Sequence, residues 1–214
     1  MKEALLVVAG YLSGSLPFGY WVARAARGVD IRTVGSGNIG ATNVWRSVGP
    51  RYGIAVVLLD TAKGFAPALA VTLVVGHLWG VLAGGAAMLG HWRPLFLRFA
   101  KGGKTVATCG GAFLGVAPVV GGIGAAMWIA VFALCRYASV ASIVAALTLP
   151  AAALALDEPW PVVGFAALAA VAVLVLHRAN IGRLRAGTES RIQLRGRKDQ
   201  PATDQPPKDQ PARA

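Results

Sequence analysis

Acidic residues are scarce in this sequence, which has nine Asp and Glu against 21 Lys and Arg. Charged residues of both signs fill only 14% of the 214 positions, whereas 56% of the positions are hydrophobic and the mean hydropathy is +0.59. A soluble domain usually has about 25% charged residues. The composition therefore excludes an ordinary soluble domain, and it predicts an all-α integral membrane protein.

Cysteine is nearly absent as well, and so are the residue sets of several enzyme classes. Cys109 and Cys135 lie in or beside apolar segments, far from any metal-like Cys or His spacing, and they are interpreted as small core residues. The basic loops lack the paired carboxylates that would hold Mg²⁺, so we expect no metal and no other cofactor. No Ser, His and Asp constellation is found, and the His-x-x-x-x-Asp pattern is missing because Leu82, Phe96 and Gly182 stand five positions after the three histidines.

Long apolar segments are abundant and set the expected architecture. A hydrocarbon core about 30 Å thick needs roughly 20 helical residues. We expect a seven-helix membrane domain over residues 1–196 and, because residues 197–214 form a polar five-residue repeat, a disordered cytoplasmic tail. The seven expected transmembrane spans are 4–26, 53–75, 78–97, 106–118, 119–135, 139–156 and 160–178.

Lys and Arg occupy alternate connections between these spans. The connections around Gly76, around Pro118 and over 157–160 contain neither residue. The positive-inside rule then places the basic loops and the C-terminus in the cytoplasm and the N-terminus outside. This arrangement accounts for the formal net charge of +12 without a nucleic acid partner. Glycines four positions apart, at 10 and 14, 80 and 84, and 111 and 115, predict closely packed helices.

The first basic loop reads Gly35-Ser-Gly-Asn-Ile-Gly-Ala-Thr-Asn-Val-Trp-Arg46. Its Gly-x-Gly-x-x-Gly pattern is not a dinucleotide fingerprint, because a transmembrane segment precedes it in place of a strand. Glycines allow close backbone approach, while hydroxyl, amide and guanidinium donors suit a phosphate or carboxylate. The donors are Ser36, Asn38, Thr42, Asn43 and Arg46. The alternative is an interfacial turn in which Arg46 pairs with lipid headgroups.

The second basic loop spans Gly90 to Thr108. It is not a Walker A motif, because Arg98 stands where the first glycine would be. A Gly102-Gly103 turn beside Lys104, at a helix start, predicts a second phosphate site. Alternatively, the lysines only set topology, and His91 is expected to pack rather than to catalyse.

The third basic loop runs from His177 to Glu189. His177 and Asn180 are three apart and share a face if the helix continues, so both side chains could reach one ligand group. Ser139 is expected to cap the sixth span, and Ser142 either faces the site or bonds its own helix. Within the second span, Asp60 and Lys63 are either a functional pair or a neutralised structural pair.

Together the three loops resemble the three cytoplasmic motifs of the bacterial acyl-phosphate:glycerol-3-phosphate acyltransferases, the PlsY family. The resemblance covers residues 1 to about 194 in order and spacing. One position departs from it, since Thr105 stands where the second motif of the family usually has glycine.

The resemblance implies transfer of a fatty acyl group from acyl phosphate to the 1-hydroxyl of glycerol 3-phosphate, giving lysophosphatidic acid and inorganic phosphate. It also implies a bacterial inner-membrane enzyme, surrounded by membrane lipids, with its active site facing the cytoplasm. Among the site residues it implies, Ser36, Asn38, Arg46 and Lys104 hold phosphate, and Ser142, His177 and Asn180 position the substrates. Lys104, His177 and Asn180 form the catalytic set, with His177 alternatively the general base. A membrane carrier for organophosphate or another anion is the alternative from a different class.

Overall fold

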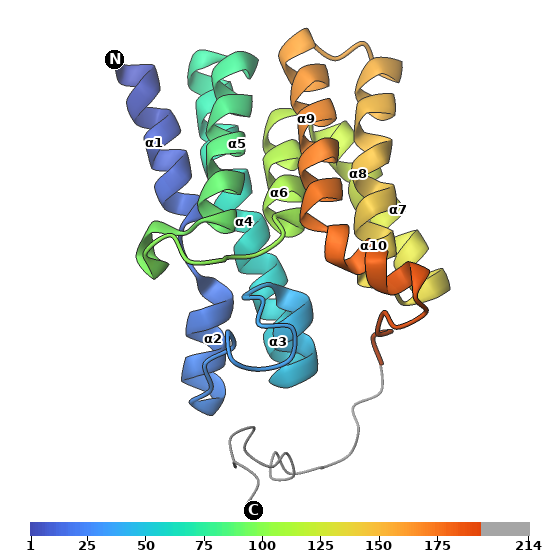
Figure 1. Cartoon of the computed structure of the whole chain (residues 1–214). Helices are drawn as coiled ribbons and strands as arrows, with labels where there is room; N and C mark the ends of the chain where they lie inside the picture. Colours follow the sequence, from blue (N-terminus) through green and yellow to red (C-terminus); the bar gives the residue numbers. More distant parts are fainter. Residues whose placement is uncertain (194–214) are drawn as a thin grey trace, which may run out of the picture.

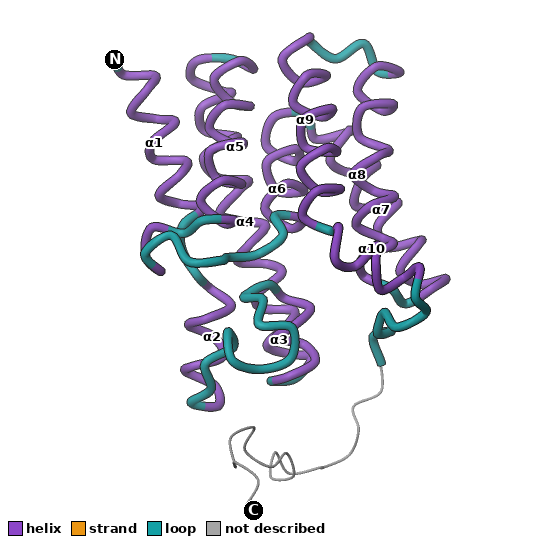
Figure 2. The backbone as a smooth tube through the Cα atoms, viewed as in Figure 1, coloured by secondary structure: helices purple, strands orange, loops and turns teal. Residues whose placement is uncertain are grey.

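The computed structural model describes residues 1–193, so the tail predicted at 197–214 lies outside the described residues. Over residues 1–193 all regular structure is helical (Figure 2), which confirms the predicted all-α class for that part of the chain. The elements are α1 (Lys2–Gly14), α2 (Phe18–Arg27), α3 (Ala41–Ser47), α4 (Pro50–Val75), α5 (His77–Trp92), the 3₁₀ turn η1 (Leu95–Leu97), α6 (Val106–Val116), α7 (Pro118–Cys135), α8 (Ala138–Ala155), α9 (Trp160–Leu176) and α10 (Arg178–Arg185).

Helices α1 and α4 to α9 run side by side as one bundle (Figure 1). Helices α2 and α3 extend beyond one end of this bundle, and α10 lies across the same end, opposite the N-terminus. The segment between α5 and α6 crosses the bundle near the middle of α4. The three loops singled out in the sequence therefore lie toward the same half of the molecule.

The first predicted span is broken. The segment expected at 4–26 forms α1 and α2, which are separated at Ser15–Pro17. Pro17 has no backbone N–H and fixes its own φ, so it favours the start of a new helix over continuation of the old one. The whole stretch Lys2–Arg27 is nevertheless long and apolar enough to cross a membrane.

The other helices match the expected spans to different degrees. Pro50–Val75, Pro118–Cys135 and Ala138–Ala155 are also long and apolar enough to cross a membrane, and α9 with α10 adds a fifth candidate if this pair, bent by 57°, counts as one span. α5 ends at Trp92 and α6 at Val116, so the expected bounds 78–97 and 106–118 were too long at their C-terminal ends. With 16 and 11 residues, these helices are only about 24 and about 17 Å long.

Small residues bring the helix backbones together, as predicted. A Cβ added to Gly14 of α1 would lie 2.0 Å from the carbonyl oxygen of Ala87 in α5. A Cβ added to Gly111 of α6 would lie 2.0 Å from the carbonyl oxygen of Thr61 in α4. Such contacts suit helices in lipid, where association depends on packing rather than on the hydrophobic effect.

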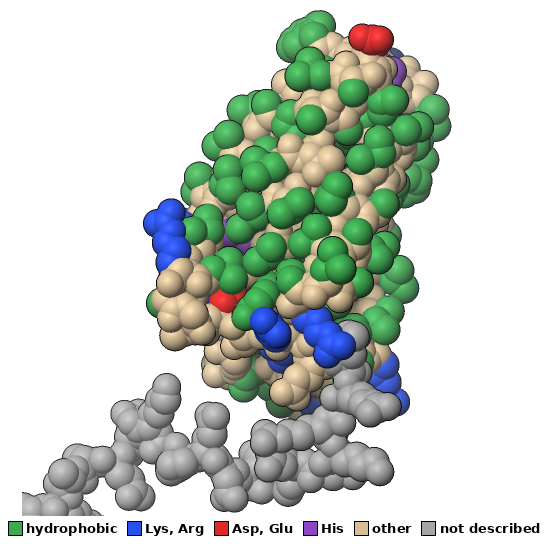
Figure 3. Space-filling model, turned by 90° about the vertical axis from the view of Figure 1, so that its right-hand side faces the viewer, with side chains coloured by type: hydrophobic (Ala, Val, Ile, Leu, Met, Phe, Trp, Pro, Cys, Tyr) green, Lys and Arg blue, Asp and Glu red, His purple; other side chains and the backbone are tan. Residues whose placement is uncertain are grey.

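The outside of the bundle is apolar. Figure 3 shows hydrophobic side chains over the flank of the bundle, with Lys and Arg gathered mainly toward the end that carries α2, α3 and α10. Leu73, Leu134 and Leu168 are each more than two-thirds exposed. Exposed leucines in this number suit a lipid-facing surface. The interior is packed around Phe113 and Phe165, whose rings stack 4.7 Å apart.

Candidate active site

A cavity of about 420 Å³ opens between α3, α4, α6, α7, α8, α9 and α10, and His91 of α5 also lines it. All seven side chains that the sequence analysis singled out for the site line this one cavity. They are Ser36, Asn38, Arg46, Lys104, Ser142, His177 and Asn180. Residues up to 144 positions apart therefore meet at a single place.

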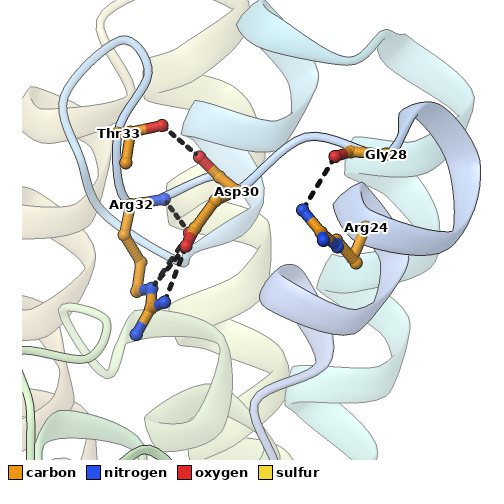
Figure 4. Close-up of polar contacts among 5 residues, drawn as sticks. All are labelled: Arg24, Gly28, Asp30, Arg32 and Thr33. Carbon is orange, nitrogen blue, oxygen red and sulfur yellow. Dashed lines mark hydrogen bonds and ion pairs between the residues drawn. The ribbon is translucent and has the colours of Figure 1, made fainter.

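The first loop begins with a tight polar turn after α2 (Figure 4). Helix α2 ends at Gly28, which has a φ of +66° and whose carbonyl accepts a hydrogen bond from Arg24 at 3.0 Å. The Asp30 carboxylate then accepts bonds from the Arg32 backbone and guanidinium, at 2.6–3.2 Å. The Arg32 guanidinium lowers the pKa of Asp30 to about 2, so this pair stays charged and holds the turn.

The Asn43 side chain holds the first loop together through hydrogen bonds to its backbone. Its amide nitrogen donates to the carbonyls of Ile31, Val34 and Asn38 at 2.9–3.2 Å, and its amide oxygen accepts from the Ser36 backbone at 3.1 Å. The buried Asn43 side chain is therefore committed to the loop itself. Asn43 was predicted to be a ligand donor, whereas this geometry gives it a structural role.

Two donors of the first loop reach other parts of the site. Asn38 accepts from Gly40 at 2.7 Å and donates to the Gly102 carbonyl at 3.3 Å, which joins the first loop to the second. Arg46, at the end of α3, donates to the Ser190 carbonyl at 2.6 Å and so joins the first loop to the third. Burial lowers the pKa of Arg46, although a guanidinium remains charged in proteins.

Lys104 projects into the cavity from the short segment before α6. Its ammonium donates to the Asn180 Oδ1 atom on α10. Burial, followed by the nearby charge of Arg183, lowers the pKa of Lys104 to about 8. Lys104 therefore carries a charge at neutral pH but loses it more readily than an exposed lysine does.

His177 stands at the bend between α9 and α10. Its Nδ1 atom lies 2.8 Å from the Val173 carbonyl, which can only accept, so Nδ1 carries the proton and Nε2 is left as an acceptor. The condition of a continuous helix is not met, because α9 ends at Leu176 and α10 is bent from it by 57°. His177 and Asn180 line the cavity together all the same.

Glu189 is a site residue that the sequence analysis missed. Its carboxylate accepts from Asn180 at 2.6 Å, from Ser139 at 2.7 Å and from Arg183 at 2.7 Å. Burial alone would raise the pKa of Glu189, but these three hydrogen bonds outweigh it and the pKa is lowered. The scarcity of acids in the basic loops was the signal that could have drawn attention to it.

The two serines of α8 behave differently from each other. Ser139 is not the N-cap that was predicted, because α8 begins at Ala138 and Tyr137 occupies the N-cap position. The Ser139 hydroxyl donates to Glu189 instead. Ser142 donates to the Ala138 carbonyl at 2.6 Å and accepts from the Trp128 indole at 3.1 Å. Both expectations for Ser142 are therefore met, since it bonds its own helix and also lines the cavity.

The cavity has two chemical halves. The lining residues from the three loops, α8 and α10 make a polar half that is rich in N–H and O–H donors and carries the cations of Arg46, Lys104 and Arg183. The other half is apolar and is bounded by α6, α7 and α8, with Leu114, Ile129, Ala145, Ala146 and Leu149 in its wall. Such a space suits an amphiphile with an anionic head and an aliphatic chain. Within residues 1–193, no group of three or more His, Cys, Asp or Glu is arranged to hold a metal ion.

Comparisons with known proteins agree on one family. The family model described as "Glycerol-3-phosphate acyltransferase" matches residues 4–187. Relatives with the name glycerol-3-phosphate acyltransferase include proteins of Desulforudis audaxviator and Geobacter sulfurreducens. Each is 47% identical, over 90% of this chain and 98% of the relative.

Two solved structures have the same fold. They are crystal structures of PlsY (YgiH), described as an integral membrane glycerol 3-phosphate acyltransferase, in its glycerol 3-phosphate form and its lysophosphatidic acid form. The TM-scores are 0.86 and 0.84 at 39% and 38% identity, over 90% of this chain and 96% of each PlsY chain. The match spans nearly the whole described structure and both polar and apolar walls of the cavity, and on this evidence the chain belongs to the glycerol-3-phosphate acyltransferase family.

Proposed function

We propose that this protein transfers a fatty acyl group from acyl phosphate to the 1-hydroxyl of glycerol 3-phosphate, releasing lysophosphatidic acid and inorganic phosphate. The observation that carries the proposal is the convergence of seven polar side chains, six from the three loops and Ser142 from α8, on a cavity with an apolar wall. Both reactants carry phosphate and one carries an acyl chain. The two halves of the cavity match these requirements.

The phosphates have two separate sets of donors. Ser36, Asn38 and Arg46 come from the first loop and from α3, whereas Lys104 comes from the segment before α6 and Asn180 from α10. Charge-assisted bonds of this kind bind phosphate strongly. Two sets allow both phosphorylated reactants to be held side by side, with the acyl chain lying against α7 and α8.

The reaction needs orientation more than it needs a nucleophilic side chain. Acyl phosphate is a mixed anhydride, so the glycerol oxygen attacks its carbonyl carbon and the bond from that carbon to the phosphate oxygen breaks. The departing phosphate accepts the electron pair, and Lys104 and Arg46 stabilise its charge. The hydroxyl proton passes to a phosphate oxygen or to Nε2 of His177, the nitrogen left without a proton by the bond to Val173.

The membrane arrangement is also proposed here. Seven spans result if the shorter α5 and α6 and the bent pair α9 and α10 are counted with the four longer stretches. The basic end, with α2, α3 and α10, then faces the cytoplasm of a bacterial inner membrane, and the N-terminus lies outside. The active site accordingly opens toward the cytoplasm, and surrounding lipids cover the apolar flank.

An assay with purified protein in lipid nanodiscs tests the proposal. Glycerol 3-phosphate is supplied with palmitoyl phosphate or with palmitoyl-CoA, and both phosphate release and lysophosphatidic acid are followed. We expect turnover with palmitoyl phosphate. Turnover only with palmitoyl-CoA would overturn the acyl donor. In proteoliposomes, transport of glycerol 3-phosphate without acyl transfer would favour the anion carrier.

A further inference from the structure

Three ionisable side chains with no direct role in the proposed chemistry are buried together at the cavity, where Asp60 and His91 are part of the lining and Lys63 lies behind them. Asp60 and Lys63 belong to α4 and His91 to the end of α5, and their exposed fractions are 2%, 4% and 4%. Lys63 Nζ lies 2.8 Å from Asp60 Oδ1, which in turn lies 3.7 Å from His91 Nδ1. Ionisable groups at this depth are expensive to bury, and they usually serve a purpose.

On one side, the cluster is fixed to the break between α1 and α2. Lys63 Nζ donates to the Leu16 carbonyl at 2.8 Å, and Ser13 donates to the Lys63 carbonyl at 2.9 Å. The Lys63 ammonium also lies 5.6 Å from the centre of the Phe18 ring. Asp60 is therefore held by a lysine whose own position is set from three directions.

On the other side, the cluster touches the turn that precedes Lys104. The backbone N–H groups of Gly102 and Gly103 donate to the carbonyls of Trp92 and His91 at 2.9 and 3.0 Å. The His91 ring packs directly against Gly103, since a Cβ added there would lie 1.9 Å from Nε2 and 2.6 Å from Cε1. The ring thus determines how closely this turn can approach α5.

We propose that Asp60, Lys63 and His91 are positioning residues for Lys104. This inference rests on the proposed function and deepens it. Lys63 holds Asp60, the Asp60 carboxylate faces the His91 ring, and the ring sets the place of Gly103, the residue before Lys104. A displacement of about 1 Å at a reacting centre can cost about 100-fold in rate. The cluster therefore determines whether the ammonium of Lys104 reaches Asn180 and the phosphate.

The contact between His91 and Gly103 is tested by adding a methyl group at position 103 and removing the ring at position 91. The backbone of Gly103 is not in the left-handed region, and the three nearest atoms to an added Cβ all belong to the His91 ring. We expect Gly103→Ala to lower kcat/KM for glycerol 3-phosphate by about 100-fold. We expect kcat/KM of the double variant His91→Ala/Gly103→Ala to be at least about tenfold higher than that of Gly103→Ala, because substitutions at residues in contact are not additive. Losses that simply multiply would overturn the proposal.

Gly102 provides the matched control. A Cβ at Gly102 would lie 2.1 Å from the His91 carbonyl oxygen and 2.8 Å from the Trp92 carbonyl oxygen. These are backbone atoms, so removal of the ring cannot relieve the collision. We expect Gly102→Ala to be equally impaired with and without His91→Ala. Rescue of Gly102→Ala would mean that loss of the ring merely loosens the loop, and this would count against the proposal.

The ion pair is tested by removing both charges at once. Asp60→Asn alone leaves Lys63 buried without its counter-ion, which tests folding as well as position. The double variant Asp60→Leu/Lys63→Met removes both charges and is expected to fold. We expect a KM for glycerol 3-phosphate raised by about tenfold. A folded double variant with wild-type KM and kcat would remove the pair from the positioning role.

A readout without turnover separates this inference from the proposed function. The rate at which an amine-reactive reagent modifies Lys104, followed by peptide mass spectrometry, reports on its surroundings directly. We expect faster modification in Gly103→Ala and a return toward the wild-type rate in His91→Ala/Gly103→Ala. If the wild-type protein shows no turnover but Gly103→Ala changes the labelling rate of Lys104, the proposed reaction is wrong and the positioning role stands. Normal turnover with unchanged labelling would sink the positioning alone.

Discussion

Lys104 and Asn180 are bonded across the cavity, ammonium to amide oxygen, although 76 residues separate them in the chain. The same Asn180 amide donates to Glu189 at 2.6 Å. A cation from the second loop, an amide from α10 and a carboxylate from the third loop thus form one continuous hydrogen-bonded series. Anionic substrates meet a cation whose direction is already fixed.

Removal of the Lys104 ammonium should abolish most of the activity. We expect Lys104→Ala to lower kcat/KM by about 100- to 1,000-fold, as loss of a donor to developing charge does. Initial rates of lysophosphatidic acid formation measure this. Lys101→Ala is the matched control, because Lys101 is exposed and outside the cavity lining. Near wild-type rates in Lys104→Ala would remove Lys104 from the site.

His177 should be needed for the chemistry and not for insertion. We expect His177→Ala to lower kcat by about 100-fold, because the imidazole offers Nε2 to the reacting groups. Membrane yield and thermal stability should remain close to wild type. His77→Ala, at the first residue of α5 and at the other end of the bundle, is the control and should keep its activity. Equal losses in the two variants would contradict a specific role for His177.

The depressed pKa of Lys104 predicts an alkaline limit. Burial lowers this pKa to about 8, so the free enzyme loses the charge of Lys104 as the pH rises through that value. Because the charged form binds phosphate, kcat/KM for glycerol 3-phosphate should fall above about pH 8. In Lys104→Arg, whatever activity remains should extend to higher pH, since a guanidinium stays protonated. A flat profile from pH 7 to 10 in the wild type would exclude Lys104 as the titrating group.

Thr105 should be a site of stored strain. This residue has a φ of +64° and is buried, and its hydroxyl lacks a hydrogen-bond partner among the described residues. A β-branched residue in this region costs free energy that glycine avoids. We expect Thr105→Gly to stabilise the protein by about 1 kcal/mol, measured as a higher Tm in detergent. Thr105→Ala is the control and should gain much less, because alanine keeps the Cβ.

Glu189 should support activity by holding other site residues. Glu189→Gln replaces an acceptor of three hydrogen bonds with an amide that must present a donor on one side. We expect kcat/KM to fall by roughly 10- to 100-fold, the usual cost of a hydrogen bond to a charged group. Glu158→Gln, in the turn between α8 and α9, is the control. Unchanged kinetics in Glu189→Gln would show that Asn180 and Arg183 hold their places without the carboxylate.

Much of the architecture could be predicted because apolar length and the distribution of Lys and Arg act locally along the chain. The break at Ser15–Pro17 and the bend at His177 were missed, since each helix segment on either side still has an apolar or amphipathic composition. α5 was predicted too long because the apolar Leu95 and Leu97 belong to a 3₁₀ turn, and α6 was predicted too long because Pro118 already begins α7. Helix ends depend on partners that composition does not contain.

The sequence predicted side chains that line the cavity, but not the connections between them. Ser36, Asn38, Arg46, Lys104, His177 and Asn180 belong to the three polar, glycine-rich segments of the sequence, and Ser142 belongs to α8. The links between them run from one loop to another, as Asn38 to Gly102 or Arg46 to Ser190 do. Glu189 was not predicted to belong with these residues, because a carboxylate does not donate hydrogen bonds to an anion. Tertiary structure alone supplies these pairings.

Helix α10 follows all the other described helices in the sequence, and this determines when its site residues are synthesised. Arg46 and Lys104 emerge from the ribosome early, whereas His177, Asn180 and Glu189 come from the last stretch of the described chain. Synthesis runs from the N-terminus, so the helices of the bundle can enter the membrane before the site exists. A polypeptide terminated shortly before α10 would keep most of the hydrophobic scaffold yet have no functioning centre. Competence to process lipid precursors therefore arises only after α10 and Glu189 have been made.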